Sequence, residues 1–196
     1  MADPTSLRAR QAPIKESYKS NPSSALVTLK SSGHIDSSSS ISCSLSSGPA
    51  IASAKSKVAG LHPAAGGDDP HISGELCSGD LLLEALVACS GVTLKAVATA
   101  LGVPIKSGTV KAEGDLDFRG TLGVDREAPV GFKEIRLGFE IEVDEEDERA
   151  KEVDEKKLSS LGRLTERYCV VLQTIVKKPE VRVSLVGGGQ RWEQSS

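Results

Sequence analysis

Residues 80–101 read DLLLEALVACSGVTLKAVATAL, and this stretch decides the fold because as a helix it is apolar on almost every side. A helix of that kind belongs in the centre of a domain. At 1.5 Å of rise per residue it is about 33 Å long, the width of a small domain. Ser78 or Asp80 is expected to cap its first turn, and Gly102, with Pro104 close behind, is expected to end it.

Cys89 lies in the middle of this helix. Three-and-four spacing gathers seven residues on its side of the helix: Leu82, Ala85, Leu86, Cys89, Val92, Thr93 and Ala96. Most cysteines on such a face are small buried hydrophobic residues whose thiols are made less acidic by their surroundings. Cys89 alone therefore predicts no chemistry, and a second cysteine segment later in the chain changes that reading.

Composition narrows the class of protein. The 196 residues are expected to form one domain, 24–186, between an N-terminal arm, 1–23, and a flexible tail, 187–196. A net charge of −3 favours neither nucleic acid nor an anionic membrane as a partner. Aromatic residues make up 3% of the chain, which argues against base-stacking surfaces.

No segment is expected to span a bilayer, because the central helix opens with Asp80 and carries Glu84 and Lys95. The N-terminus has no apolar stretch like that of a secretory signal, so a cytoplasmic location is expected, with a mitochondrial one as the alternative. The cysteines are too few for a disulfide framework and favour free or redox-active thiols: Cys43, Cys77, Cys89 and Cys169.

The N-terminal half of the domain shows short alternating segments. ALVTLK at 25–30 and SISCSL at 40–45 predict a hairpin with its turn at 33–39. Residues 46–60 leave a third strand and a helical turn equally open. Residues 60–79 are rich in Gly, Pro and Asp and predict a long loop before the central helix.

The C-terminal half has a clearer pattern. Residues 109–118 and 134–143 alternate over their whole length and predict a second hairpin. The charged run 144–157 is expected to be a solvated helix start. Apolar residues then continue on one face of a helix that is expected to break near Cys169 and to end by Pro179, before a last strand at 180–186.

DLLLEALVACSGVTL and LTERYCVV, in this order, resemble the OsmC/Ohr family of osmotically inducible and organic hydroperoxide resistance proteins. The order of predicted elements agrees with that family, and the resemblance covers roughly residues 25–186. It implies an α+β, OsmC-like fold. Two central Cys-bearing helices would be wrapped by antiparallel or mixed sheets in an intertwined homodimer, with active sites at the subunit interface.

The resemblance also implies a function in the oxidative stress response, as a thiol peroxidase acting on organic hydroperoxides. Cys89 would be the peroxidatic cysteine and Cys169 the resolving one, and the expected reductant is a dithiol, of which a lipoyl type is one form. The thiolate would become a sulfenic acid and then a disulfide, which needs no cofactor and no metal. An apolar pocket would favour lipid-type hydroperoxides over hydrogen peroxide.

The chain departs from the family around the peroxidatic cysteine. The family places a glutamate ten residues before it, where this chain has Gly79. The family also uses an arginine from the N-terminal strands, and residues 25–45 contain none. The residues that remain as candidates to support the thiolate are Asp80, Glu84 and Arg10, although Glu84 is rotated about 140° from Cys89 on the helix.

Two other functions stay open. The missing arginine and glutamate favour a non-catalytic OsmC-like dimer whose pocket binds an apolar ligand. A hydrolase or acyl transferase that pairs Cys89 with a histidine is less favoured. The reason is that the three histidines fall outside the predicted helices and strands: His34, His62 and His71. Neither His62 nor His71 has a spacing to cysteine or carboxylate typical of a metal site.

Overall fold

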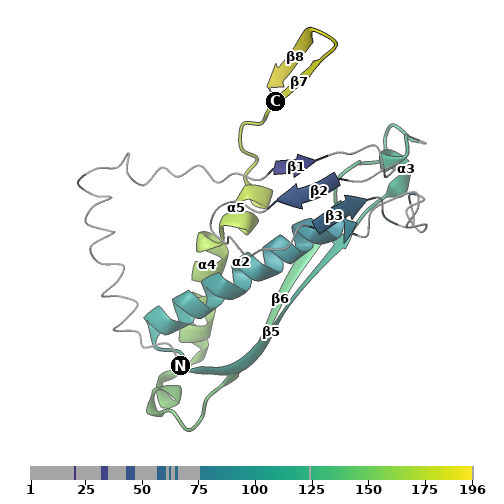
Figure 1. Ribbon diagram of the computed structural model, residues 1–196. Helices are drawn as coiled ribbons and strands as arrows, with labels where there is room; N and C mark the ends of the chain where they lie inside the picture. The colour runs from purple at the N-terminus through teal and green to yellow at the C-terminus, as the bar shows by residue number, and fades with distance from the viewer. Residues whose placement is uncertain are drawn as a thin grey trace.

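A computed structural model describes Ser20 and residues 32–34, 43–46, 57–60, 62, 65, 76–123 and 125–195. The strand expected at 25–30, together with Arg10 and His71, lies outside these residues. Within them the chain is an α+β protein organised around one long helix, as Figure 1 shows.

That helix is α2, Ser78–Leu101. Its N-cap is Cys77, which makes no side-chain capping hydrogen bond, so the expected cap by Ser78 or Asp80 is wrong. Both residues lie inside the first turn, because β4 runs straight into the helix. The C-terminal prediction is confirmed, since Gly102 has φ 67° and donates its N–H to the last helical carbonyls.

The face of α2 that one chain buries is not the predicted one. Leu86, Ser90, Leu94 and Ala98 are buried, at a regular spacing of four, and Ser90 satisfies its hydroxyl on the carbonyl of Val87 at 3.3 Å. Only Leu86 belongs to the predicted set. The buried face packs on β5, α4 and α5. The main core cluster forms where this face ends: Leu94, Ala98, Val103, Ile105 and Leu161.

By length and composition α2 could cross a membrane, so the expectation that no segment could do so is wrong. Its mean hydropathy over an 18-residue window is 1.8. The value is high because the window contains at most two charged side chains and is otherwise mostly apolar. A mostly buried core helix of a soluble protein passes the same test, whereas 22% of this window is buried in the single chain, where α2 packs against β5, α4 and α5.

The predicted second hairpin is confirmed as β5, Ile105–Asp115, paired antiparallel with β6, Glu134–Val143. It forms a long curved ribbon along α2 (Figure 1). Its two faces differ as the alternation requires: Phe139 and Ile141 pack toward the core, while Lys111 and Glu140 form a 3.1 Å ion pair on the other face. Phe118 opens the short helix α3, Phe118–Thr121, instead of extending the strand.

Four short strands precede α2 and form one sheet in the order β1-β2-β3-β4. They are β1 Ser32–His34, β2 Cys43–Ser46, β3 Lys57–Gly60 and β4 Leu76–Cys77. The first three pair antiparallel, and β3 pairs parallel with β4. The predicted turn 33–39 is wrong at its start, because residues 33 and 34 belong to β1, which pairs with β2. Within 46–60, residues 57–60 form the strand β3, whereas residues 47–56, where a helical turn was the alternative, lie outside the described residues.

After β6 the chain forms the 3₁₀ helix η3, Glu148–Glu152, then α4, Glu155–Tyr168, and α5, Val170–Val176. Asp154 caps α4 by accepting from the N–H of Lys157 at 2.7 Å. The expected last strand is β7, Arg182–Gly187. The expected flexible tail is instead β8, Gln190–Ser195, because Gly188 and Gly189, both with positive φ, make a two-residue turn that pairs it with β7.

Candidate functional site

Cys169 lies at the junction of α4 and α5. Its φ and ψ of −73° and 108° are extended, so one helix ends and the next begins at this residue. Its N–H still bonds to the carbonyl of Thr165 at 3.0 Å, and its carbonyl accepts from Gln173 at 2.9 Å. The predicted break is confirmed, but Cys169 caps a helix rather than lying inside one. The first N–H groups of α5 are left without helical acceptors.

Cys89 of α2 faces this junction. The thiols of Cys89 and Cys169 are in hydrogen-bonding contact, and both are free. The N–H groups of Val170 and Val171 also point to the sulfur of Cys89. The structure therefore brings the two predicted active-site cysteines together, although 79 intervening residues separate them in sequence.

The surroundings lower the pKa of Cys89. Burial disfavours its thiolate, but hydrogen bonds from Val171 N–H, the Cys169 thiol and Val170 N–H outweigh that penalty. The hydroxyl of Thr93 contributes a further hydrogen bond. This residue lies one turn after Cys89, and its single hydroxyl proton is shared with the Cys89 carbonyl, which lies 2.8 Å from the Thr93 oxygen. All of these donors are neutral groups, and they make Cys89 the more nucleophilic of the two thiols.

The same contact acts in the opposite direction on Cys169. Burial raises the pKa of the Cys169 thiol, and the hydrogen bond to Cys89 and the repulsion from its charge raise it further. The N–H groups of Leu172 and Val171 oppose this effect without overcoming it. The first proton lost by the pair therefore leaves Cys89, with Cys169 as the protonated donor beside it.

Access to the two sulfurs also differs. Cys169 is 0% exposed, whereas Cys89 is half-buried. Apolar side chains adjoin the pair: Val92 is 73% exposed one helical turn from Cys89, and Val170 is 68% exposed. Tyr168, on the other side of Cys169, is exposed beneath the guanidinium of Arg167, which lies 5.6 Å from its ring centre. An external molecule can therefore reach the sulfur of Cys89 but not that of Cys169, and the exposed side chains of Val92, Tyr168 and Val170 are called the apolar rim below.

The acids proposed to support Cys89 lie elsewhere. Asp80 and Glu84 line a shallow hollow of about 390 Å³ between α2 and Ala112 of β5, and Cys89 is not part of it. Asp80 precedes Cys89 by nine residues, about 13.5 Å along the helix axis. The groups that shift the pKa of Cys89 come from residue 93 and residues 169–171. Arg10 lies outside the described residues.

In the part of the chain that the structure describes, no histidine is among the groups that shift the pKa of either thiol. His62 stacks on Phe118, with ring centres 5.0 Å apart, and the backbone of His34 belongs to β1. Among the residues that the structure describes, no group of three or more His, Cys, Asp or Glu side chains is arranged to hold a metal ion. Cys77 is the N-cap residue of α2, twelve residues before Cys89. Its Sγ lies 3.6 Å from the position that a Cβ on Gly79 would occupy.

Sequence reasoning missed the donors that surround Cys89. Thr93 was placed on the same face as Cys89, and its four-residue spacing was the signal that it could reach the cysteine. The amides of Val170 and Val171 carry no such signal, because they become donors only where the helix is interrupted at Cys169.

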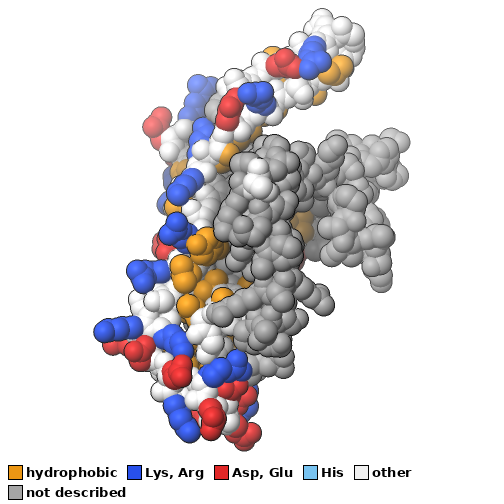
Figure 2. All heavy atoms as spheres, turned by 90° about the vertical axis from the view of Figure 1, so that its left-hand side faces the viewer, with side chains coloured by type: hydrophobic (Ala, Val, Ile, Leu, Met, Phe, Trp, Pro, Cys, Tyr) orange, Lys and Arg blue, Asp and Glu red, His pale blue; other side chains and the backbone are white. Residues whose placement is uncertain are grey.

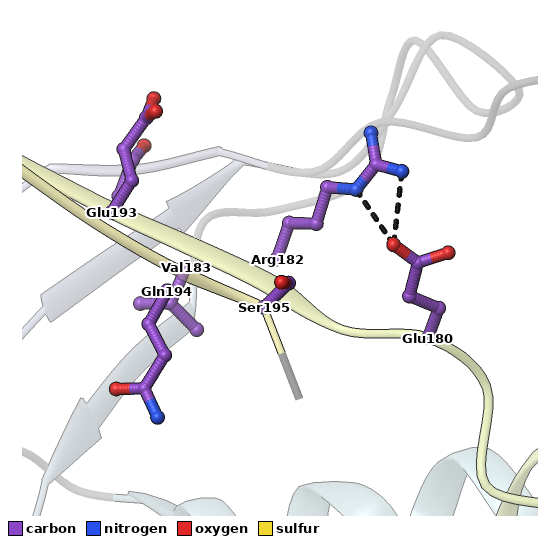
Figure 3. A pocket seen from close by; sticks show the side chains of 7 residues that line it. Glu180, Arg182, Val183, Glu193, Gln194 and Ser195 are labelled. Atoms are coloured by element: carbon purple, nitrogen blue, oxygen red, sulfur yellow. Dashed lines mark hydrogen bonds and ion pairs between the residues drawn. The ribbon is translucent and has the colours of Figure 1, made fainter.

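A separate hollow of about 510 Å³ lies on the C-terminal hairpin, where Arg182 pairs with Glu180 at 2.9 Å (Figure 3). All its lining residues are exposed, and neither cysteine takes part.

Comparison with known proteins identifies relatives of the fold. A family model described as OsmC-like protein matches residues 71–184. A search of curated protein sequences finds no match. The matching range contains both cysteines, both helices around Cys169 and the β5–β6 hairpin.

Solved structures agree on the fold at low identity. An OsmC-like protein of Mycoplasma pneumoniae is 16% identical, with a TM-score of 0.55 over 78% of this chain and 89% of its own. An OsmC-like protein of unknown function from Vibrio cholerae is 11% identical, with a TM-score of 0.58 over 76% and 94%. An organic hydroperoxide resistance protein, OsmC, of Legionella pneumophila is 15% identical, with a TM-score of 0.51 over 78% and 91%.

Proposed function

This chain belongs to the OsmC-like protein family, and on that premise we propose that it is a thiol-dependent peroxidase that reduces organic hydroperoxides to alcohols. Cys89 is the peroxidatic cysteine and Cys169 the resolving one. The observation that carries the proposal is the contact between one half-buried thiol of lowered pKa and one fully buried thiol.

The first step uses Cys89 alone. Its thiolate attacks the terminal oxygen of the hydroperoxide, the O–O bond breaks, and the alkoxide leaves and takes up a proton as the alcohol. The sulfur keeps the transferred oxygen as a sulfenic acid. The N–H groups of Val170 and Val171 hydrogen-bond to the sulfur before the attack and favour its thiolate, and no charged side chain is among the groups that shift its pKa.

The second step depends on the opposite pKa shifts of Cys89 and Cys169. Oxidation removes the negative charge of Cys89, and with it the repulsion that holds Cys169 protonated. The amides of Leu172 and Val171 then favour the Cys169 thiolate. That thiolate attacks the sulfenic sulfur, hydroxide leaves as water, and a Cys89–Cys169 disulfide forms. An external dithiol, of which a lipoyl-type compound is the first to try, restores both thiols by exchange.

The substrate follows from the apolar rim. Each methylene that the rim removes from water favours binding by about 0.8 kcal/mol, so alkyl and lipid-type hydroperoxides bind better than hydrogen peroxide. We infer that the working unit is a homodimer, with neither nucleic acid nor a membrane as partner, and that the protein acts in the cytoplasm or in mitochondria. Neither Asp80 nor Glu84 takes part in these two steps.

Intact mass tests this function. One equivalent of cumene hydroperoxide should remove two hydrogens from the reduced protein and give a Cys89–Cys169 disulfide in the peptide map. Cys169→Ser should retain an added oxygen on Cys89, because the resolving thiol is gone. Cys77→Ser is the matched control and should behave as wild type. Hydrogen peroxide should react more slowly.

One outcome would favour the other candidate. If Cys89 stayed reduced at hydroperoxide concentrations that oxidise Cys43 or Cys77, the thiol would be an inert core residue. The protein would then be a non-catalytic OsmC-like dimer that binds an apolar ligand.

A further inference from the structure

The environment of Cys89 suits a second kind of electrophile. Its thiolate is held by two backbone N–H groups, a thiol and a hydroxyl, all of them neutral. Attack on a disulfide expels a thiolate, whose conjugate acid has a pKa near 8.5, so the leaving group needs no acid to protonate it. Attack on a hydroperoxide expels a much more basic alkoxide. The neutral donors around Cys89 are thus sufficient for disulfide exchange.

The difference in burial gives the exchange a direction. Cys169 is 0% exposed and cannot reach an external disulfide, whereas Cys89 is half-buried at an apolar rim formed by Val92, Val170 and Tyr168. A mixed disulfide would therefore form on Cys89 only. Cys169 already touches the sulfur of Cys89, so it stands next to the bond it would have to break.

We propose that the Cys89–Cys169 pair also reduces low-molecular-weight, uncharged alkyl disulfides by thiol–disulfide exchange. This activity uses the site of the proposed peroxidase but not its oxygen chemistry. It requires only the two thiols in contact, the accessible position of Cys89 and the buried position of Cys169.

The exchange has two balanced steps. The Cys89 thiolate attacks one sulfur of R–S–S–R, forms Cys89–S–S–R and releases one thiolate, which is protonated to RSH. Cys169 loses its proton and attacks the Cys89 sulfur of the mixed disulfide, so that a second RS⁻ leaves and a Cys89–Cys169 disulfide forms. The substrate gains two electrons and two protons, and the protein loses them. The dithiol named as reductant above returns them.

The apolar rim determines which disulfides react. An uncharged alkyl disulfide buries its methylenes against Val92 and Val170, whereas glutathione disulfide would bring several charges to the same surface at a desolvation cost. The uncharged class should therefore react faster at Cys89 than glutathione disulfide does. At Cys77 the reaction rates of the uncharged disulfide and of glutathione disulfide should differ less.

The test uses reduced full-length protein and 2-hydroxyethyl disulfide as the probe. Wild type should lose two hydrogens and release two equivalents of thiol. Cys169→Ser should stop at one 2-mercaptoethanol adduct, mapped to Cys89 and formed about tenfold or more faster than any adduct on Cys77, because exchange rate follows thiolate fraction and access. Cys77→Ser should match wild type. Glutathione disulfide should give the same products more slowly.

Cumene hydroperoxide on the same samples separates the two proposals. Oxidation of Cys89 by the hydroperoxide but not by the disulfide would overturn the exchange activity and leave the peroxidase. Reaction with the disulfide alone would overturn the peroxidase and support exchange. Adducts that form on Cys43 or Cys77 as fast as on Cys89 would overturn the exchange proposal, as would a mixed disulfide on Cys89 that Cys169 fails to resolve in the wild type.

Discussion

At the scale of single residues, the acidity of Cys89 depends on short-range donors, and Thr93 is the one that a side-chain change can remove. We expect Thr93→Val to raise the pKa of Cys89 and to slow its alkylation by iodoacetamide at pH 7 about 2- to 10-fold, since one hydrogen bond contributes about 0.5–1.5 kcal/mol. Thiolate is the reactive form, so the rate rises with pH, and the variant's profile should lie at higher pH than that of wild type.

Thr99→Val is the matched control for this measurement. Thr99 makes the same backbone hydrogen bond one turn back, to Lys95 at 2.8 Å, but it lies ten residues after Cys89 on α2. Its alkylation profile should coincide with that of wild type. Equal effects of the two substitutions would mean that Thr93 acts on helix stability and not on the thiol.

At the scale of elements, two glycines on helices predict opposite changes in stability. Gly102 ends α2 with φ 67°, a conformation that costs an L-residue roughly 1 kcal/mol, so Gly102→Ala should destabilise the protein by about that amount. Gly162 lies inside α4, and a Cβ there meets no atom within 4 Å. Gly162→Ala should therefore stabilise by about 0.5–1 kcal/mol.

Urea unfolding of the two variants checks this pair. Each change should move the transition midpoint and leave the slope unaltered, because neither substitution changes the surface exposed on unfolding by much. A stabilising Gly102→Ala would show that the left-handed cap is absent in solution.

The elements differ in how far the sequence predicts them. α2 and the β5–β6 hairpin follow from periodicity, because each carries many residues in one repeating pattern. The sequence does not predict strand β8, because GGG at 187–189 is typical of a flexible tail, although two glycines between alternating segments are also a hairpin signal. The cysteine pair was found through the family resemblance, whereas its backbone donors depend on tertiary packing that no local pattern encodes.

At the scale of the whole molecule, many large apolar side chains of the described residues are exposed in a single chain. Only 22% of the apolar window of α2 is buried, and Figure 2 shows hydrophobic side chains gathered at mid-height on one face of the protein. The β7–β8 hairpin extends away from the other described elements (Figure 1). A two-stranded hairpin by itself is marginally stable in water, so this one needs a surface to pack on.

The hairpin itself shows which face is to be covered. Leu185 pairs with Trp192, and Val183 lies two residues from Leu185 on the same face. On the opposite face Ser184 pairs with Glu193. Leu185 is 67% exposed and Trp192 is 51% exposed in the single chain. A homodimer would bury the apolar face and leave the polar face in water.

We therefore expect sedimentation at micromolar concentration to show a dimer, and Leu185→Lys to shift it toward monomer. Each buried leucine contributes about 1.5–3 kcal/mol, and the substitution removes two per dimer. Ser184→Lys, on the polar face of the same strand, should leave the dimer intact. Trp192 is the only tryptophan, so its emission reports the hairpin directly. It should be blue-shifted in the dimer and move to longer wavelength in Leu185→Lys. A folded monomer at micromolar concentration would contradict the dimer, and a dimer with water-exposed Trp192 emission would place the interface away from the hairpin.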